Sequence, residues 1–140
     1  MEDLQQSGRV RLIGVSNVSL EQIAALWRGA AVKPAIVQNR CYARTGWDRE
    51  VRAFCRDRGV LCEGFSLLTA NLRELSAPAV RRIVARTGRT LPEVVFRFCL
   101  DLGLIVLTGT TSGEHMRQDL GCFDIQLEPG EIRLLEDLPA

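Results

Sequence analysis

Polar side chains follow each of four short apolar runs in the sequence. They are Ser16 with Asn17, Gln38 with Asn39, Ser66, and the stretch 108–112. Hydroxyl and amide groups of this kind can hydrogen-bond a small ligand. The loop 108–113 (TGTTSG) would suit a phosphate, because it leads into a predicted helix whose first backbone N–H groups are free. It lacks the Gly-Lys-Ser/Thr ending of a P-loop. A single site of this kind could equally serve turn formation or helix capping, whereas four on one rim favour ligand binding.

The apolar runs that must position these side chains alternate with amphipathic helical segments. The runs are residues 10–15 (VRLIGV), 35–38 (AIVQ), 60–65 (VLCEGF) and 104–107 (LIVL). Continuous apolar strands separated by helices predict a parallel sheet covered on both faces. In such α/β folds the carboxyl ends of the strands meet at one edge, where ligands bind. The polar residues are therefore expected on one rim.

Helix boundaries are indicated by capping signals. Ser19 with Gln22, Thr90 with Glu93, and Thr111 with Glu114 have the spacing of capping boxes. Further helices are predicted from about residue 48 to Gly59, over residues 78–87, and near the C-terminus with Pro129 close to its start. These elements predict four βα units in one domain of residues 1–140. The periodicity does not distinguish an open sheet from a barrel.

Composition narrows the class of protein. With 18 basic and 17 acidic residues the net charge is +1, so no nucleic-acid partner and no anionic membrane is predicted. The longest apolar runs are far too short for a membrane span, and the first residues do not resemble a signal peptide. Five cysteines without a CxxC pair, and a single histidine, indicate buried thiols in a reducing compartment and no metal site. We expect a soluble, cytoplasmic protein.

In this order and spacing, the segments resemble the aldo-keto reductase family over essentially the whole chain. Residues 8–17 (GRVRLIGVSN), 35–40 (AIVQNR), 60–68 (VLCEGFSLL) and 104–120 (LIVLTGTTSGEHMRQDL) are similar to strands five to eight of that family and their loops. The resemblance implies an α/β fold that forms half of a TIM-type (β/α)8 barrel, with four βα units and a C-terminal helix. It also implies NAD(P)H-dependent carbonyl reduction.

The resemblance implies a role for each rim residue in holding the cofactor. Ser16, Asn17 and Gln38 would hydrogen-bond the nicotinamide carboxamide and fix the face of the ring that is presented. Phe65 would stack on that ring, with a core aromatic as the alternative. The loop that touches the diphosphate is matched by Ser66 and Leu68.

The loop after the fourth run departs from the family pattern. Gly109 and Thr110 stand where the family has a Lys-Ser pair for the 2′-phosphate of NADP, and His115 stands in place of an arginine. The missing cations would each supply a charge-assisted hydrogen bond, so the implied cofactor is NADP(H) or NAD(H). The cofactor positions that the resemblance implies in this region are Gly109, Thr110, Thr111, Ser112, His115, Gln118 and Asp119, the last two at positions that contact adenine.

No catalytic residue is assigned. The family's Asp, Tyr, Lys and His tetrad lies on the first four barrel strands, and Tyr42 and Lys33 do not match it. The resemblance therefore implies an aldo-keto reductase truncated to its cofactor-binding half and inactive alone. The alternatives are a non-catalytic dinucleotide-binding or assembly module, and a gene fragment without selected function. Half of a barrel exposes two strand edges, so a homodimer through these edges is expected.

Overall fold

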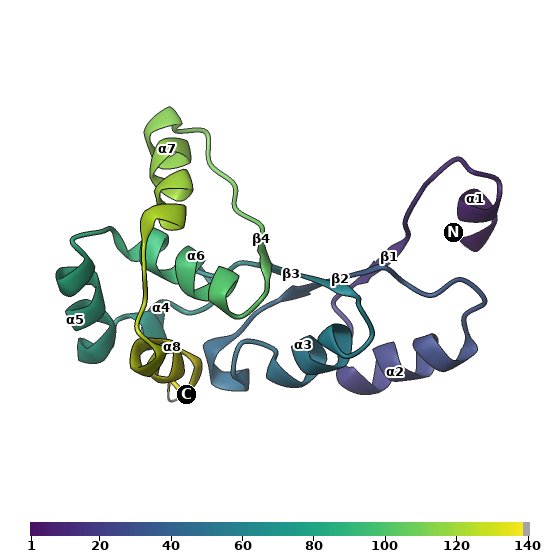
Figure 1. Ribbon diagram of the computed structural model, residues 1–140, viewed down its shortest axis with the longest axis horizontal. Coiled ribbons are helices and arrows are strands. Elements are labelled where there is room, and N and C mark those ends of the chain that lie inside the picture. Colours follow the sequence, from purple (N-terminus) through teal and green to yellow (C-terminus); the bar gives the residue numbers. More distant parts are fainter. Residues whose placement is uncertain (139–140) are drawn as a thin grey trace.

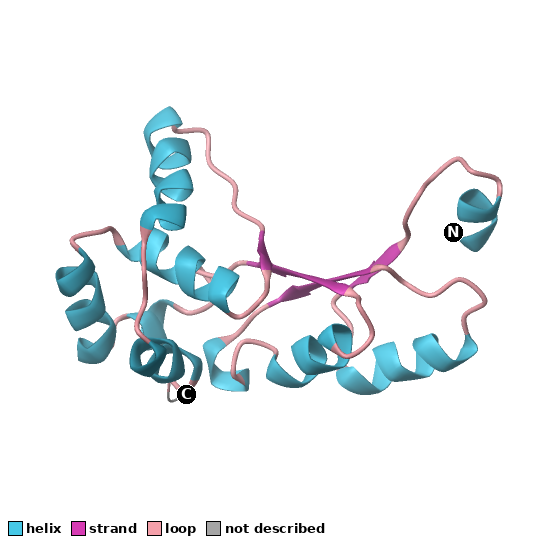
Figure 2. Cartoon of the chain, in the orientation of Figure 1, coloured by secondary structure: helices cyan, strands magenta, loops and turns pink. Residues whose placement is uncertain are grey.

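The computed structural model describes residues 1–138 and is built on one parallel sheet (Figures 1 and 2). Its four strands are β1 (Gly14–Ser16), β2 (Ile36–Arg40), β3 (Leu61–Phe65) and β4 (Ile105–Val106). They lie in the order β1-β2-β3-β4, so each strand pairs with the next one along the chain. The predicted α/β class, with βα units and a parallel sheet, is confirmed.

Most helices fall close to the predicted segments. The helices are α1 (Glu2–Gln6), α2 (Leu20–Gly29), α3 (Arg49–Arg56), α4 (Leu72–Leu75), α5 (Pro78–Thr87), α6 (Leu91–Asp101), α7 (Gly113–Gly121) and α8 (Pro129–Glu136), with 3-10 turns η1 (Ala43–Thr45) and η2 (Cys122–Asp124). The short helices α1 and α4 were not predicted. Within residues 1–138, no helix combines the length and the apolar character needed to cross a membrane.

Side-chain caps explain several of these boundaries. The Ser19 and Thr90 capping boxes form as predicted at the starts of α2 and α6. The predicted Thr111 box is wrong, because α7 begins one residue later. Ser112 is its cap, and the Ser112 Oγ accepts from the backbone N–H of His115 at 3.3 Å. The Thr110 hydroxyl accepts from the Ser112 N–H at 3.1 Å, which holds the loop in this register.

Both edge strands are shorter than their apolar runs. The run 10–15 pairs with β2 only from Gly14 onward, with one further hydrogen bond from Ala35 N to the Ile13 carbonyl at 2.8 Å. Pro34, which precedes that point, has no N–H to continue the ladder. At the other edge, only Ile105 and Val106 of the run 104–107 are strand. The apolar runs therefore overestimate the lengths of both edge strands, β1 and β4.

The helices cover only one face of the sheet, so the prediction of two covered faces is wrong. Val37 and Cys62 point toward the helices and are buried. Their neighbours along β2 and β3 point to the other side, where Leu61 is 48% exposed. Ile105 of β4, which is aligned with Glu63, is 40% exposed on the same side. In Figure 1, α2, α3 and α8 lie below the sheet, while α1 and α7 rise at its two ends. The face of the sheet opposite these helices is uncovered, and we call it the open face.

The core lies between the sheet and the helices, and α8 closes one end of it. Trp47 is fully buried and packs edge-on against Phe98, with ring centroids 5.2 Å apart. The Trp47 indole N–H donates to the carbonyl of Leu135 in α8 at 2.8 Å. Close by, Arg52 pairs with Glu136 at 2.5 Å. The five cysteines are free thiols and all are buried, as predicted.

Candidate functional site

A row of hydrogen-bonded side chains crosses three strands on the open face, from the carboxyl end of β1 to the middle of β2 and of β3. Asn17 Nδ2 donates to Ser16 Oγ at 3.2 Å, and Ser16 Oγ donates to Gln38 Oε1 at 3.5 Å. Gln38 Nε2 donates to Glu63 Oε2 at 3.0 Å. Strand register aligns Ser16 with Gln38 and Gln38 with Glu63, so the row follows from the parallel pairing. We call these four residues the rim row. The predicted residues Ser16, Asn17 and Gln38 are thus brought into direct contact.

The backbone is strained at two rim positions. Asn17 has a φ of 54° and Ser66 a φ of 56°, in the left-handed region that residues with a side chain rarely adopt. Each directly follows the end of its strand, β1 and β3 respectively. Asparagine tolerates this conformation better than serine, because its amide can hydrogen-bond locally. Strain of this kind is common where a backbone is held in place for function.

Buried amides hold the rim loops in position. Asn71, only 1% exposed, donates to the carbonyls of Cys41 at 3.0 Å and Leu67 at 2.8 Å, and accepts from the Ala43 N–H at 2.7 Å. It thereby ties the loop after β2 to the loop after β3. Nothing in the local pattern of the sequence distinguished this asparagine.

Asn39 similarly connects the end of β2 to the loop after β1 and to the start of α3. It accepts from the backbone N–H of Val18 at 3.0 Å and donates to the Val18 carbonyl at 2.8 Å and to Asp48 Oδ2 at 2.7 Å. Burial raises the pKa of the Asp48 carboxyl, although the hydrogen bond from Asn39 and the charge of Arg52 act in the opposite direction. Asn39, one of the polar residues at the second strand end, is therefore structural.

A cleft of about 410 Å³ lies where α7 faces the start of α6 and the loop after β3. We call it the α7 cleft, and its lining is Leu68, Thr90, Pro92, Phe96, Thr108, Gly109, Thr110, His115, Gln118 and Asp119. The predicted cofactor residues in this lining are Leu68, Gly109, Thr110, His115, Gln118 and Asp119. The other two predicted residues of this loop lie outside it: Thr111 is exposed, and Ser112 caps α7.

Phe65 lines a different groove, of about 700 Å³, between the loops after β1 and β2. Its ring is half-buried, and the Arg40 guanidinium lies 5.5 Å from the ring centroid. Strand register aligns Arg40 with Phe65, which explains the contact. Asn17 lines the same groove, so Phe65 is close to one end of the rim row. The ring therefore stands at the rim and not in the core.

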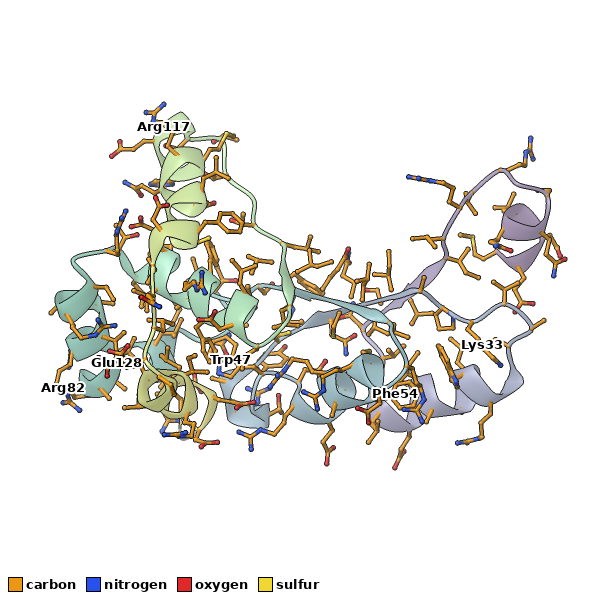
Figure 3. The ribbon with its side chains drawn as sticks, viewed as in Figure 1. Lys33, Trp47, Phe54, Arg82, Arg117 and Glu128 are labelled. Atoms are coloured by element: carbon orange, nitrogen blue, oxygen red, sulfur yellow. The ribbon has the colours of Figure 1, made fainter. Side chains whose placement is uncertain are left out.

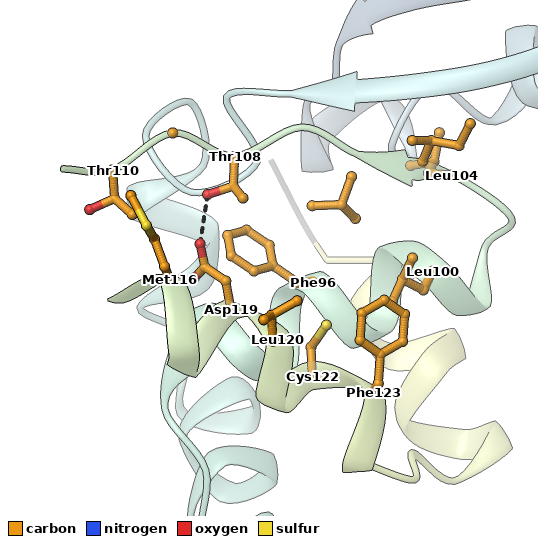
Figure 4. A pocket seen from close by; sticks show the side chains of 13 residues that line it. Phe96, Leu100, Leu104, Thr108, Thr110, Met116, Asp119, Leu120, Cys122 and Phe123 are labelled. Carbon is orange, nitrogen blue, oxygen red and sulfur yellow. Dashed lines mark hydrogen bonds between the residues drawn. The ribbon is translucent and has the colours of Figure 1, made fainter. Parts of the chain in front are cut away.

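An apolar groove of about 570 Å³ adjoins the α7 cleft beside β4 (Figure 4). Phe96, Leu100, Leu120 and Phe123 contribute its walls. Leu120 and Phe123 are 67% and 63% exposed, unusually high values for large apolar side chains. At its boundary with the cleft, Thr108 Oγ1 donates to Asp119 Oδ2 at 3.0 Å.

Groups that could move a proton are widely separated. Lys33 lies before β2, and its ammonium group donates to the carbonyls of Trp27 and Ala30 at 2.6 and 2.8 Å. Tyr42 follows the opposite end of the same strand. His115 is on α7, with its Nδ1 3.4 Å from Thr110 Oγ1. These are the only lysine, tyrosine and histidine of the sequence.

Sequence reasoning missed several residues of the site. Glu63 is the one charged residue of the run 60–65, and this position in an apolar strand was a usable signal for an open-face side chain. Thr90 and Pro92 join the cleft from the start of α6, a segment distant in sequence from the loop that they face. Contacts between segments so distant in sequence cannot be predicted from a local pattern.

Known proteins resemble the chain over its whole length. A family model described as "Aldo/keto reductase family" matches residues 1–139. Rho crystallin from Aquarana catesbeiana is 28% identical over 150 residues, which is 99% of this chain and 46% of that protein. The apo crystal structure of Gox0644 is similar with a TM-score of 0.88 at 27% identity, covering 99% of this chain and 51% of that one. A Gox0644 mutant in complex with NADPH gives a TM-score of 0.87 at the same identity, with the same shares of the two chains covered.

These matches agree with the architecture. The chain spans about half the length of the curated relatives it matches, and its parallel sheet with helices corresponds to half of an aldo-keto reductase barrel. The family model, the relatives and the fold all lead to the same assignment: the chain belongs to the aldo/keto reductase family.

Proposed function

We propose that this chain binds a nicotinamide dinucleotide, NADP(H) or NAD(H), along the carboxyl rim of its sheet, as the cofactor-binding half of a carbonyl-reducing oxidoreductase. The observation that carries the proposal is the rim row, which presents hydroxyl, amide and carboxylate groups on an open face. The α7 cleft provides a second, separate binding region at the other end of the same rim. A dinucleotide has two ends of different chemistry, and this arrangement suits both.

The groups present fit a carboxamide at the rim row. A carboxamide offers one acceptor and two donors, and Ser16, Asn17 and Gln38 together supply both kinds of partner. The hydrogen bond from Ser16 to Gln38 is long, at 3.5 Å. A ligand can therefore replace it with little loss. Phe65 would stack on the ring, and the strained residue Ser66 would direct backbone toward the diphosphate together with Leu68.

The cofactor, when bound, supplies the hydride, and the role of this chain is to orient it. Reduction of a carbonyl also needs a proton donor, and general acid catalysis typically contributes about 10²–10⁴-fold. Lys33 and Tyr42 stand at opposite ends of β2 and cannot act as a pair. We therefore propose that the 140-residue chain binds the cofactor without reducing carbonyls by itself.

Calorimetry with NADPH and NADH tests this proposal. We expect binding by the purified chain, and Gln38→Ala should weaken it by about tenfold, equivalent to roughly 1.4 kcal/mol. Gln126→Ala, which changes an exposed amide, should leave the affinity unchanged. Equal weakening by both variants, or no binding to the unmodified chain, would contradict the assignment of the rim row. Sustained turnover of a simple aldehyde would contradict the non-catalytic part, and loss of that turnover in Tyr42→Phe would identify the acid.

We also propose a second copy of the chain as a partner that pairs with the strand edges and covers the open face outside the rim row. The accessible surface is 8310 Å², whereas a folded monomer of 15.6 kDa has about 7,250 Å². The excess of roughly 1,000 Å² is comparable to the 800 Å² or so that each partner contributes to a standard interface. Parallel pairing of β4 with β1 of the other copy, and of β1 with β4, would leave neither sheet with an unpaired edge strand.

Light scattering at micromolar concentration decides between one copy and two. A dimer that becomes monomeric in Ile105→Lys, with Arg81→Lys as the exposed control, supports the proposal. A stable monomer that does not bind a hydrophobic dye would contradict it. The five free, buried thiols support a reducing compartment, and we propose the cytoplasm as the location.

A further inference from the structure

The α7 cleft contains one fixed negative charge. Thr108 donates to Oδ2 of Asp119, and within residues 1–138 the second oxygen of that carboxylate accepts no hydrogen bond. That oxygen is available to a donor on a ligand. Gln118, the other predicted adenine contact, donates to Glu114 Oε1 at 3.3 Å, so a second carboxylate lies on the same helix.

No lysine or arginine lines the cleft. Arg89, which precedes the lining residue Thr90, is held by the buried carboxylate of Glu93 at 3.4 Å. Arg117 belongs to the middle of α7, and its guanidinium extends back toward Gly113 at the start of the helix (Figure 3). The lining therefore carries Asp119, uncharged groups, and the imidazole of His115.

The donors at the start of α7 are already partly in use. The Ser112 N–H is bound by the Thr110 hydroxyl, and the His115 N–H by the Ser112 hydroxyl. Glu114 adds a negative charge in the first turn of the helix. These contacts reduce what this helix end could offer to an anion, because amides that satisfy a cap are not free to bind a phosphate.

From this charge pattern we infer that the chain binds NAD(H) in preference to NADP(H), with Asp119 and Gly109 as the specificity-determining residues. The inference rests on the proposed function, because it takes the α7 cleft as the region for the adenosine ribose. A 2′-phosphate carries up to two negative charges, meets no cation in this lining and is repelled by the Asp119 carboxylate, whereas a free 2′-hydroxyl is uncharged and escapes that repulsion. The chain would then prefer NADH, whereas the similar Gox0644 mutant structure is a complex with NADPH.

The test is a comparison of dissociation constants for NADH and NADPH, measured by calorimetry at one fixed ionic strength. We expect NADH to bind at least about tenfold more tightly than NADPH. Gly109→Lys adds a cation where a side chain meets no heavy atom within 4 Å. It should strengthen NADPH binding by about tenfold while changing NADH binding less than about twofold. Asp119→Asn removes the negative charge of the lining, so it should narrow the preference by strengthening NADPH binding.

Arg117→Ala is the matched control, because it removes an exposed cation of α7 that does not line the cleft. We expect it to leave both affinities unchanged, and thermal melts should show that every variant is folded. Equal affinity for the two coenzymes, or tighter NADPH binding that is lost in Arg117→Ala, would overturn the inference and leave the proposed function standing. Binding of neither coenzyme by the folded chain would overturn both.

Discussion

Asn71 is the single side chain whose removal should most disturb the rim. Substitution Asn71→Ala leaves three buried backbone groups without partners: the Ala43 N–H and the carbonyls of Cys41 and Leu67. Each unsatisfied buried group costs about 1–3 kcal/mol, less where water can enter. We expect the free energy of unfolding to fall by about 3–5 kcal/mol, a large part of the stability of a small domain.

Thermal unfolding followed by circular dichroism measures this loss. For a chain of this size each kcal/mol corresponds to roughly 3–4 °C, so the midpoint should fall by about 10 °C or more. Hydrogen exchange gives a local measurement, because the amide of Ala43 should lose its protection. Asn71→Asp, which keeps an acceptor for Ala43 but loses both donated bonds, should be destabilised at neutral pH and recover in part when the carboxyl is protonated. A loss below about 1 kcal/mol in Asn71→Ala would refute the tie between the two loops.

Three further changes test other parts of the fold. Trp47→Phe keeps an aromatic ring against Phe98 but leaves the Leu135 carbonyl unpaired, and urea denaturation should show a loss of about 2 kcal/mol; an unchanged midpoint would contradict this. Because burial raises the pKa of Asp48 in the folded state, its ionisation opposes folding at neutral pH, and that effect disappears as the pH falls below the unfolded pKa of about 3.9. Asp48→Asn should therefore increase stability at pH 7 by up to about 1 kcal/mol and have no effect near pH 3.5, whereas an equal gain at both pH values would contradict the assignment. Ser66→Gly should relieve the positive φ and raise stability by up to about 1 kcal/mol in a thermal melt, while Ser76→Gly, at a negative φ, should lower it.

The elements with local signals were predictable from the sequence. Residues 78–87 were predicted as a helix and form α5, and the boxes at Ser19 and Thr90 start α2 and α6. A capping hydroxyl acts within one turn of its own helix, so local sequence contains most of the information. The choice between Thr111 and Ser112 failed because both are hydroxyl residues next to each other. The hydrogen bond from Ser112 N to Thr110, which selects between them, is a detail of the folded loop.

Features that depend on distant segments were not predictable. Leu61 and Ile105 have the apolar side chains of a buried strand, so the sequence pattern could not show that they stand on an uncovered face. The rim row was predicted in part, because parallel strands bring their carboxyl ends together whatever the loops do. Its Glu63 and the contribution of Thr90 to the α7 cleft depend on strand register and helix packing, which follow from the whole fold.

The contact between Trp47 and α8 has a consequence for the order of folding. Consecutive strands are neighbours in the sheet, so most of the fold can form by closing short loops in sequence order. The bond from Trp47 to Leu135 instead joins residues 88 positions apart, and closing a loop of that length costs about 4 kcal/mol of entropy. Once that bond has brought α8 to this position, the Arg52–Glu136 pair can form with little further loss of chain entropy. We therefore expect docking of α8 to be a late, cooperative step of folding, and its release to be an early local opening that hydrogen exchange would detect.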